Sequence, residues 1–411
     1  MKLLYITPSF PYPPRKGYEL IAYHHIKQLA ARCHSVDLIS FANADAGYSV
    51  SGPAKWCGQI YTVELPAWKS ALNLLLRAPL GEPFQVSFFR SAQMAELVSR
   101  QLQTTDYKVV IFQTIRMVQY CPEWYTGATI FSIVDPLMLS YQRSLPWRAW
   151  YTRLAVKAEA DRLRRYEPQQ ASRFDRSLLI AAADLRDYQN FLNGAKNCGH
   201  YQKLLDRIKL DWVPHGVDTD VFRPSTSITR QPGMIVMTGN MHHAPNVDAV
   251  DYFCREIFPL IQENEPLANL WLVGSRPAAA VRKWSKHKNI TVTGFVPDIR
   301  PYLNRAMVSV CPVRLNVGTQ TKVLEALAMG TPVVTTTDGN HGVAAVTGEH
   351  LYVADTVSEF AERVVGLLRG EKWAEVSKNG RRFVVENFTW EKSATKIERI
   401  LSEVVASVKC T

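Results

Sequence analysis

The stretch Gly318–Val334, GTQTKVLEALAMGTPVV, decides the fold class of this chain. Its central residues have the apolar spacing of a helix, and Gly330 suits the left-handed position just beyond a helix end. Thr331 and Pro332 block continuation of the helix, and the apolar pair after them is typical of a strand buried on both faces. A turn, a helix and a buried strand in this order predict an α/β domain with a parallel sheet.

Short β-branched segments alternate with longer amphipathic segments along the rest of the chain, which predicts repeated βαβ units. The expected strands are 2–7, 35–40, 59–63, 108–112, 129–133 and 177–181, followed by 234–238, 269–273, 290–293, 308–311 and 332–336. The expected helices are 17–32, 91–103, 246–258, 278–287, 299–304, 322–329 and 389–408.

The alternation pauses at Asp211–Pro224, DWVPHGVDTDVFRP, where two prolines and a glycine in a polar setting favour a connector. We therefore predict two Rossmann-like domains, residues 1–220 and residues 221–388. The final segment, 389–411, has a helical apolar pattern, and we expect it to pack back on the N-terminal domain.

Composition and charge narrow the class of protein. The seven cysteines form no Cys-x-x-Cys pair, so we expect reduced thiols in a cytoplasmic protein without a disulfide framework or a zinc site. The N-terminal MKLLYITPSF favours a first strand over a signal peptide, and no apolar run has the length of a membrane-spanning helix. A formal net charge of +11 favours a polyanionic partner, but the dispersed basic residues and the lack of a recognition motif argue against nucleic acid.

The stretch Pro146–Arg165 combines the aromatic residues Trp147, Trp150 and Tyr151 with six lysine and arginine residues. On a helix, this composition suits the interface of an anionic bilayer, which would make the protein peripheral on the inner face of the membrane. The alternative is an ordinary domain helix with a solvated basic face. The sequence leaves both interpretations open.

Lys322 and Glu325 lie three residues apart, so both project from one face of the predicted helix. Thr319 stands just before this helix, whose first-turn N–H groups together with Lys322 favour a phosphate. Glu325 is placed to accept two hydrogen bonds from a ribose diol. An exposed ion pair between the two side chains is the alternative interpretation.

At this point the segments resemble a known family. GTQTKVLEALAMGTPVVTT resembles the nucleotide-sugar-binding segment of the retaining glycosyltransferases of family 4, which have the GT-B fold. WVPHGVDTDVF resembles the interdomain signature of that family, with His215 in place of the usual asparagine. MTGNMHHAPNVDAVDYF, LWLVGSRP and VTGFVPDIRPYLNRAMVSVCP resemble successive units of its C-terminal domain. PYPPRKG and IVDPLMLSYQR resemble the subgroup associated with bacterial exopolysaccharide gene clusters. The resemblance implies two Rossmann-like domains with a deep cleft between them.

The resemblance also implies where the donor binds. Phe295 and Val296 correspond to residues beside the nucleobase, Lys322 to the residue on the diphosphate and Glu325 to the residue on the ribose. Gly274 corresponds to the residue that opens a loop near the donor.

In the N-terminal domain, PSFPYPPRKGYEL resembles the loop that approaches the donor phosphate, with Gly17 as the residue of close contact. Glycine suits this role because it lets backbone N–H groups reach an oxyanion. The alternative is that Gly17 only begins a helix.

The chain departs from the family pattern at several positions. The first glutamate of the family falls on Val317, and the usual arginine and lysine after the first C-terminal strand are replaced by Asn240, His242 and His243. We therefore expect Asn240 to line the donor site, and Lys322 to neutralise the diphosphate with assistance from Arg276 or Arg314. No metal ion and no cofactor besides the donor substrate is expected, because neighbouring histidines point in different directions and no carboxylate lies at ligand spacing.

Many family members place a histidine after an N-terminal-domain strand, where this chain has Asp135 in IFSIVDPLM. A carboxylate there is suited to accept a sugar hydroxyl or the acceptor proton, so Asp135 is our candidate catalytic residue. The alternative is a helix cap or turn residue before Pro136.

The main hypothesis is therefore a hexosyltransferase that uses a nucleoside diphosphate sugar and a glycan or lipid-linked acceptor, with retention, in polysaccharide biosynthesis. A nucleotide-sugar 2-epimerase of the same fold is one alternative. A catalytically silent sugar-binding protein, suggested by the missing glutamate and arginine, is another.

Overall fold

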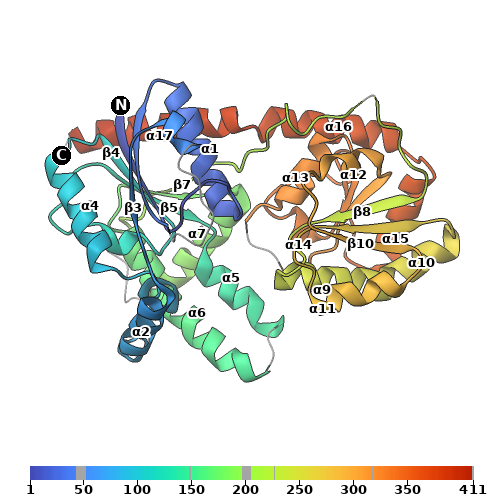
Figure 1. Ribbon diagram of the computed structural model, residues 1–411, viewed down its shortest axis with the longest axis horizontal. Helices are drawn as coiled ribbons and strands as arrows, with labels where there is room; N and C mark the ends of the chain where they lie inside the picture. The colour runs from blue at the N-terminus through green and yellow to red at the C-terminus, as the bar shows by residue number, and fades with distance from the viewer. Residues whose placement is uncertain (43–51, 148–149, 197–204, 226, 316–317, 410–411) are drawn as a thin grey trace. The chain divides into compact units, whose positions relative to one another are not determined.

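The computed structural model of the protein describes residues 1–42, 52–147, 150–196, 205–225, 227–315 and 318–409 (Figure 1). The chain forms two compact units: Met1–Pro214 together with Trp390–Thr411, and His215–Thr389. Each unit has its own parallel sheet covered by helices, so the predicted α/β class with two Rossmann-like domains is confirmed. Among the described helices, none is both long enough and apolar enough to cross a bilayer.

The first unit contains a seven-stranded sheet in the order β3-β2-β1-β4-β5-β6-β7, with every neighbouring pair parallel. Its strands are β1 (Lys2–Thr7), β2 (Ser35–Phe41), β3 (Cys57–Val63), β4 (Val109–Gln113), β5 (Thr129–Val134), β6 (Arg176–Leu179) and β7 (Leu210–Trp212). The six strands expected there are confirmed. The edge strand β7 was assigned to the connector, because three residues are too few to show a period.

Helices cover both faces of this sheet. The helices of the first unit are α1 (Gly17–Ala31), α2 (Ala67–Arg77), α3 (Phe84–Ser87), α4 (Ala92–Thr104), α5 (Leu137–Ser144), α6 (Trp150–Ala171), α7 (Ala182–Lys196) and α17 (Trp390–Lys409). Alternate residues of β1 enter separate cores: Leu3 and Tyr5 pack with α1 and α17, whereas Leu4 and Ile6 pack with α4, α6 and α7. Figure 1 shows α17 beside α1 at the edge of the unit.

Aromatic and polar contacts attach α17 to α1 within the first unit. The Trp390 ring stacks on the His24 ring at a centroid distance of 4.2 Å. The neighbouring His25 places Nε2 3.2 Å from Ser393 Oγ, and Arg32 forms an ion pair with Glu398 at 3.2 Å. The last helix of the chain therefore completes the core of the first unit.

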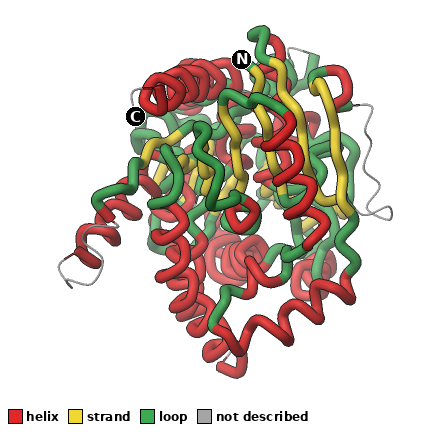
Figure 2. Tube along the Cα trace, turned by 90° about the vertical axis from the view of Figure 1, so that its left-hand side faces the viewer, coloured by secondary structure: helices red, strands yellow, loops and turns green. Residues whose placement is uncertain are grey.

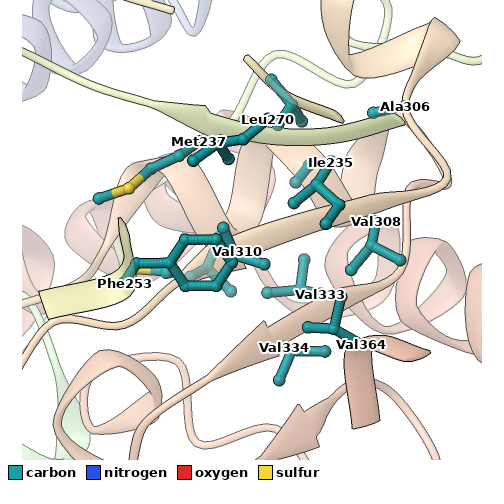
Figure 3. Packing of buried hydrophobic residues seen from close by; sticks show 14 of the residues in the cluster. Ile235, Met237, Phe253, Leu270, Ala306, Val308, Val310, Val333, Val334 and Val364 are labelled. Carbon is teal, nitrogen blue, oxygen red and sulfur yellow. The ribbon is translucent and has the colours of Figure 1, made fainter. Parts of the chain in front are cut away.

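The second unit contains a six-stranded sheet in the order β10-β9-β8-β11-β12-β13. Its strands are β8 (Met234–Thr238), β9 (Asn269–Val273), β10 (Ile290–Gly294), β11 (Val308–Cys311), β12 (Val333–Thr335) and β13 (Tyr352–Val353). Its helices are α9 (Ala244–Tyr252), α10 (Phe258–Asn264), α11 (Ala279–Arg282), α12 (Arg300–Arg305), α13 (Thr321–Ala328), α14 (Thr337–Asn340), α15 (Val357–Leu368) and α16 (Trp373–Asn387). Figure 3 shows strand residues such as Ile235 and Val310 packed with Phe253 and Val364 from the covering helices.

The helix expected over residues 246–258 is wrong in one respect. The chain forms α9, then a π-helical turn over Phe253–Ile257, and then α10. Pro259, the second residue of α10, has no N–H to donate to the carbonyl four residues earlier, so a wider turn is accommodated there.

The end of α13 has the features that its sequence predicts. Gly330 has a φ of +63°, and its N–H donates to the carbonyl of Leu327 while the N–H of Thr331 donates to the carbonyl of Ala326. These two bonds are those of a Schellman motif.

Arg230 donates hydrogen bonds to further carbonyl groups around this helix end. Its guanidinium donates to the carbonyls of Met329 and Gly330 at the end of α13, and to those of Leu303 and Ala306 at the end of α12. The ring of Trp373 lies 5.0 Å from the guanidinium, and burial lowers the pKa of Arg230 to about 10. One cation therefore fixes α13, the helix that carries Lys322 and Glu325, relative to α12.

Replacing Arg230 by methionine is expected to lower the free energy of unfolding of the second unit by about 2–4 kcal/mol, because several carbonyls lose their donor while the aliphatic stem is kept. Urea unfolding followed by circular dichroism measures the change. Arg305→Met, at an exposed residue of α12, serves as the matched control. Equal stability of the two variants would contradict the role given to Arg230.

Candidate functional site

The second unit presents a site where the strand order of its sheet reverses. β8 lies between β9 and β11, so the chain proceeds to one side through β9 and β10 and to the other through β11, β12 and β13. Loops at the carboxyl ends of β8 and β11 diverge at such a point and leave a crevice in which α/β proteins bind ligands. The N-termini of α9 and α13 follow these two strands.

Lys322 joins the starts of these two helices. Its Nζ donates to Asn246 Oδ1 at 2.6 Å, and Asn246 Nδ2 donates to the carbonyl of Asn240 at 2.9 Å. Asn246 is buried in the first turn of α9, whereas Lys322 is half-buried in the first turn of α13. A cation is thus held beside two helix N-termini, where N–H groups lack intrahelical acceptors, and this combination favours a phosphate or diphosphate.

Two glycines bring the loops after β8 and β9 into backbone contact. A Cβ on Gly274 would lie 1.7 Å from the carbonyl oxygen of Gly239, and Gly239 has a φ of +151°. The loops are also hydrogen-bonded, since Gly239 N–H donates to Val273 and Met241 N–H donates to Ser275. No other residue type fits at position 274 without moving one of these loops.

Asn240 and Arg276 lie on the two paired loops. Both are exposed, and Arg276 has a φ of +53°, which is uncommon for a residue with a side chain. Backbone strain of this kind concentrates at ligand sites. The structure therefore brings three of the expected residues, Asn240, Gly274 and Arg276, to the same edge of the sheet as Lys322.

Glu325 lies one turn after Lys322 on α13. Burial raises the pKa of its carboxyl group to about 7, and the nearby charge of Lys322 opposes this rise. Among the residues that the structure describes, none donates a hydrogen bond to this carboxylate. Glu325 therefore has acceptor capacity available for a bound diol.

Phe295 and Val296 follow β10, two strands away from β8 and hence about 10 Å along the sheet edge. The Phe295 side chain is 75% exposed, and Gly294 before it has a φ of +70°. An exposed aromatic ring at a strand end is suited to stack on a planar base.

The remaining expected contacts on this unit have protein partners. Thr319 Oγ1 donates to the carbonyl of Gly342 at 3.3 Å, which fixes the loop before α13. Arg314 forms a two-point ion pair with Asp248, at 2.6 and 3.1 Å, and its guanidinium lies 4.2 Å from the Tyr252 ring. The structure therefore argues against Arg314 as a helper of Lys322 and leaves Arg276 for that role. Val317 lies outside the described residues.

In the first unit, Gly17 begins α1 beside the strand-order reversal between β1 and β4. A Cβ added there would meet no atom within 4 Å, so packing within the protein does not require a glycine. Gln113, the last residue of β4, donates from Nε2 to the carbonyl of Tyr18 at 2.8 Å and so fixes the start of α1.

Asp135 follows β5 at the same edge of the first sheet. Burial, together with the charge of Asp184, raises the pKa of the Asp135 carboxyl group to about 7. Its Oδ1 is buried without a hydrogen-bond partner among the described residues. α5 begins at Leu137 with Pro136 as its N-cap residue, so Asp135 is not the helix cap offered as the alternative.

Two β-branched residues near Asp135 have left-handed backbones. Val134 has a φ of +68° and Thr114, after the neighbouring strand β4, has a φ of +65°. Such conformations are outliers for β-branched residues and cost about 1–3 kcal/mol each. This strain marks the region as a second candidate site.

Sequence analysis missed Asn246, Thr114 and Val134. Asn246 could have been recognised from the sequence in the same way as Lys322, because both lie in the first turn of a helix that follows a strand and a glycine. The strain at Thr114 and Val134 has no signal in residue type, since neither residue favours a positive φ.

Comparisons with known proteins agree with this geometry. Residues 232–370 match the family model described as Glycosyl transferases group 1. No match is found among proteins of curated function. Sucrose-phosphate synthase from Thermosynechococcus elongatus has a similar structure, with a TM-score of 0.70 and 16% identity over 99% of each chain.

Two further solved structures are also similar. HepE from Anabaena in complex with UDP has a TM-score of 0.62 and 14% identity, over 98% of this chain and 100% of that one. WaaG, a glycosyltransferase involved in lipopolysaccharide biosynthesis, has a TM-score of 0.62 and 15% identity, over 97% of this chain and 99% of that one. The chain therefore has the GT-B fold, and the match over residues 232–370 supports a glycosyltransferase.

Gly274→Ala is expected to lower the thermal stability of the second unit, because the new Cβ forces the loop after β9 away from Gly239. Calorimetry measures the effect. Gly194→Ala, in the exposed part of α7 with no atom within 4 Å, is the control and should raise stability slightly. An unchanged melting temperature in Gly274→Ala would contradict the close packing of the two loops.

Proposed function

We propose that this protein transfers a hexosyl unit from a nucleoside diphosphate sugar to a glycan or a lipid-linked acceptor, with retention of the anomeric configuration, in polysaccharide biosynthesis. The observation that carries the proposal is the Lys322 ammonium group, held 2.6 Å from Asn246 Oδ1 between the starts of α9 and α13. Solved structures of HepE, a protein of similar fold, contain UDP and UDP-glucose. This agrees with a nucleotide sugar as the donor.

The arrangement of side chains suggests how a donor would bind. The diphosphate would accept hydrogen bonds from Lys322 and from first-turn N–H groups, with Arg276 assisting. The ribose hydroxyls would donate to Glu325, and the base would stack on Phe295 beside Val296.

Transfer breaks the bond between the anomeric carbon and the diphosphate oxygen and forms a bond from that carbon to an acceptor oxygen. Lys322 would stabilise the negative charge that develops on the leaving diphosphate. The acceptor hydroxyl must lose a proton, and we propose Asp135 as its recipient, since a carboxyl group with a pKa near 7 is suited to proton transfer at neutral pH. We propose that no metal ion takes part.

A panel of nucleotide sugars tests this function, with and without EDTA and with and without oligosaccharide or lipid-linked acceptors. Nucleotide release only in the presence of an acceptor supports transfer, and NMR of the product determines the anomeric configuration. Conversion of one nucleotide sugar into another without acceptor would instead identify an epimerase. Binding without any turnover would identify a silent sugar-binding protein.

Lys322→Ala is expected to weaken UDP-glucose binding by about 10–100-fold, because a charge-assisted contact to the diphosphate is lost. Isothermal titration calorimetry measures the dissociation constant. Lys286→Ala, which removes an exposed lysine of the same unit, is the matched control and should bind UDP-glucose normally. Identical affinities in the two variants would refute the diphosphate assignment.

Donor affinity is also expected to depend on pH through Glu325. Its raised pKa of about 7 means that the carboxyl group is increasingly protonated below pH 7, and a protonated carboxyl accepts the two ribose hydroxyls poorly. UDP-glucose should therefore bind more weakly at pH 6 than at pH 8. Its diphosphate diester does not titrate in this range, so it is a suitable probe.

The Glu325→Gln variant isolates this effect. It should bind UDP-glucose more weakly at high pH and show little pH dependence, because its amide does not titrate. A pH dependence as steep as that of the original protein would show that another group is responsible.

A further inference from the structure

The helix α2 packs against the first unit with its polar side. Ser70 is buried, and Asn73 Nδ2 donates to the carbonyl of Arg90 at 2.8 Å. The opposite side of the helix is apolar and faces solvent. It consists of Trp68, Leu72, Leu75 and Leu76, which are 64%, 47%, 74% and 62% exposed.

This orientation is the reverse of the usual one. A surface helix of a globular protein normally buries its apolar stripe, because each buried leucine contributes about 1.5–3 kcal/mol. The four exposed apolar residues of α2 have the spacing i, i+4, i+7 and i+8, so their side chains form a continuous stripe along the helix. Leu80, just beyond the helix, is also 72% exposed.

The first two turns of α6 add a second exposed apolar group. Trp150, Tyr151 and Leu154 are 82%, 71% and 81% exposed. Arg162, two turns after Leu154 on α6, donates to the carbonyl of Ala78, the residue after α2, at 2.9 Å. In Figure 1, α2 and α6 lie at the end of the first unit away from α17. Figure 2 shows this end of the unit, at the bottom of the view, from a second side. We use the name α2–α6 apolar face for the exposed apolar residues of α2 and of the first turns of α6 taken together.

The two stretches of chain that carry the α2–α6 apolar face, residues 67–80 and 150–158, have charges of one sign. Lys69 and Arg77 on α2 are exposed, as are Arg153 and Lys157 on α6. Residues 67–80 and 150–158 contain no aspartate or glutamate. The face therefore combines tryptophan, tyrosine and leucine with cations, which is the composition of helices that lie in the interface of anionic bilayers.

A second copy of this chain is a poorer occupant. The protein has a formal net charge of +11, and two copies joined through this face would bring their cations together. An anionic lipid surface satisfies both the exposed apolar side chains and the cations around them.

We infer that α2, together with the first turns of α6, binds the surface of an anionic bilayer, with Trp68, Leu75 and Leu76 entering the headgroup–acyl boundary. Sequence analysis singled out only residues 146–165 for this role. The inference rests on the orientation of α2 and does not depend on the proposed transfer reaction.

Co-sedimentation with phosphatidylcholine vesicles, prepared with and without phosphatidylglycerol, tests the inference. The full-length protein should bind the vesicles that contain phosphatidylglycerol. A variant with Leu75→Ser and Leu76→Ser should bind them at least about tenfold more weakly. Because both leucines are exposed, this variant should keep its melting temperature and its affinity for UDP-glucose. Leu267→Ser, at an 86% exposed leucine of the second unit, is the matched control and should bind normally.

A second variant separates charge from apolar contact. Lys69→Glu combined with Arg77→Glu should also reduce binding to the phosphatidylglycerol vesicles by at least about tenfold, and added salt should weaken binding of the original protein. Equal vesicle binding by the original protein and the double serine variant would overturn the inference. So would a dimer in sedimentation velocity that the double serine variant dissolves, since the face would then be an interface between two copies.

Discussion

The candidate site of the second unit depends on one close approach, that of the Gly239 carbonyl to Gly274. A side chain at position 274 would place its Cβ 1.7 Å from that oxygen, so the loops after β8 and β9 meet only because glycine is present. The hydrogen bonds between these loops prolong the pairing of β8 and β9 beyond the strands themselves. Backbone geometry positions Asn240 and Arg276. The carbonyl of Asn240 accepts a hydrogen bond from Asn246 Nδ2, and Asn246 Oδ1 accepts one from Lys322.

Electrostatics divide the candidate residues into two classes. Lys322 and Arg230 are cations that donate to neutral oxygen atoms. Lys322 donates to the Asn246 amide between two helix starts, and Arg230 donates to the carbonyls of two helix ends. Glu325 and Asp135 are acids whose charged forms are disfavoured by burial, so the pKa of each is near 7. The two cations are thus hydrogen-bonded to amide and carbonyl oxygens of the protein. Each of the two acids keeps an oxygen atom that accepts no hydrogen bond from the described residues. Groups that destabilise the folded state in this way are common where a ligand later supplies the missing contacts.

Much of the fold was predictable because strand and helix periods are local. The Schellman end of α13 follows from Gly330 and Pro332, and strands such as Met234–Thr238 were predicted with their observed bounds. Candidate site residues in the first turn of a helix that follows a strand, such as Lys322, could also be predicted from the sequence. The pairing of Arg314 with Asp248 was not, because it joins residues 66 positions apart. The orientation of α2 also could not be predicted from the sequence, because its amphipathic pattern is the same whether the apolar side faces the core or the solvent.

The first unit is built from both ends of the chain, and this has a consequence for biosynthesis. The sheet of that unit is complete at β7, but its core lacks Ile397, Ile400, Leu401 and Val404 until α17 is added. The second unit, by contrast, is one continuous segment whose two ends are joined by a hydrogen bond from Val217 N–H to the Phe388 carbonyl. During translation, the whole second unit is therefore synthesised, and can fold, before the last helix of the first unit has been made. During synthesis, the apolar face that awaits α17 is the part of the nascent chain that remains uncovered longest.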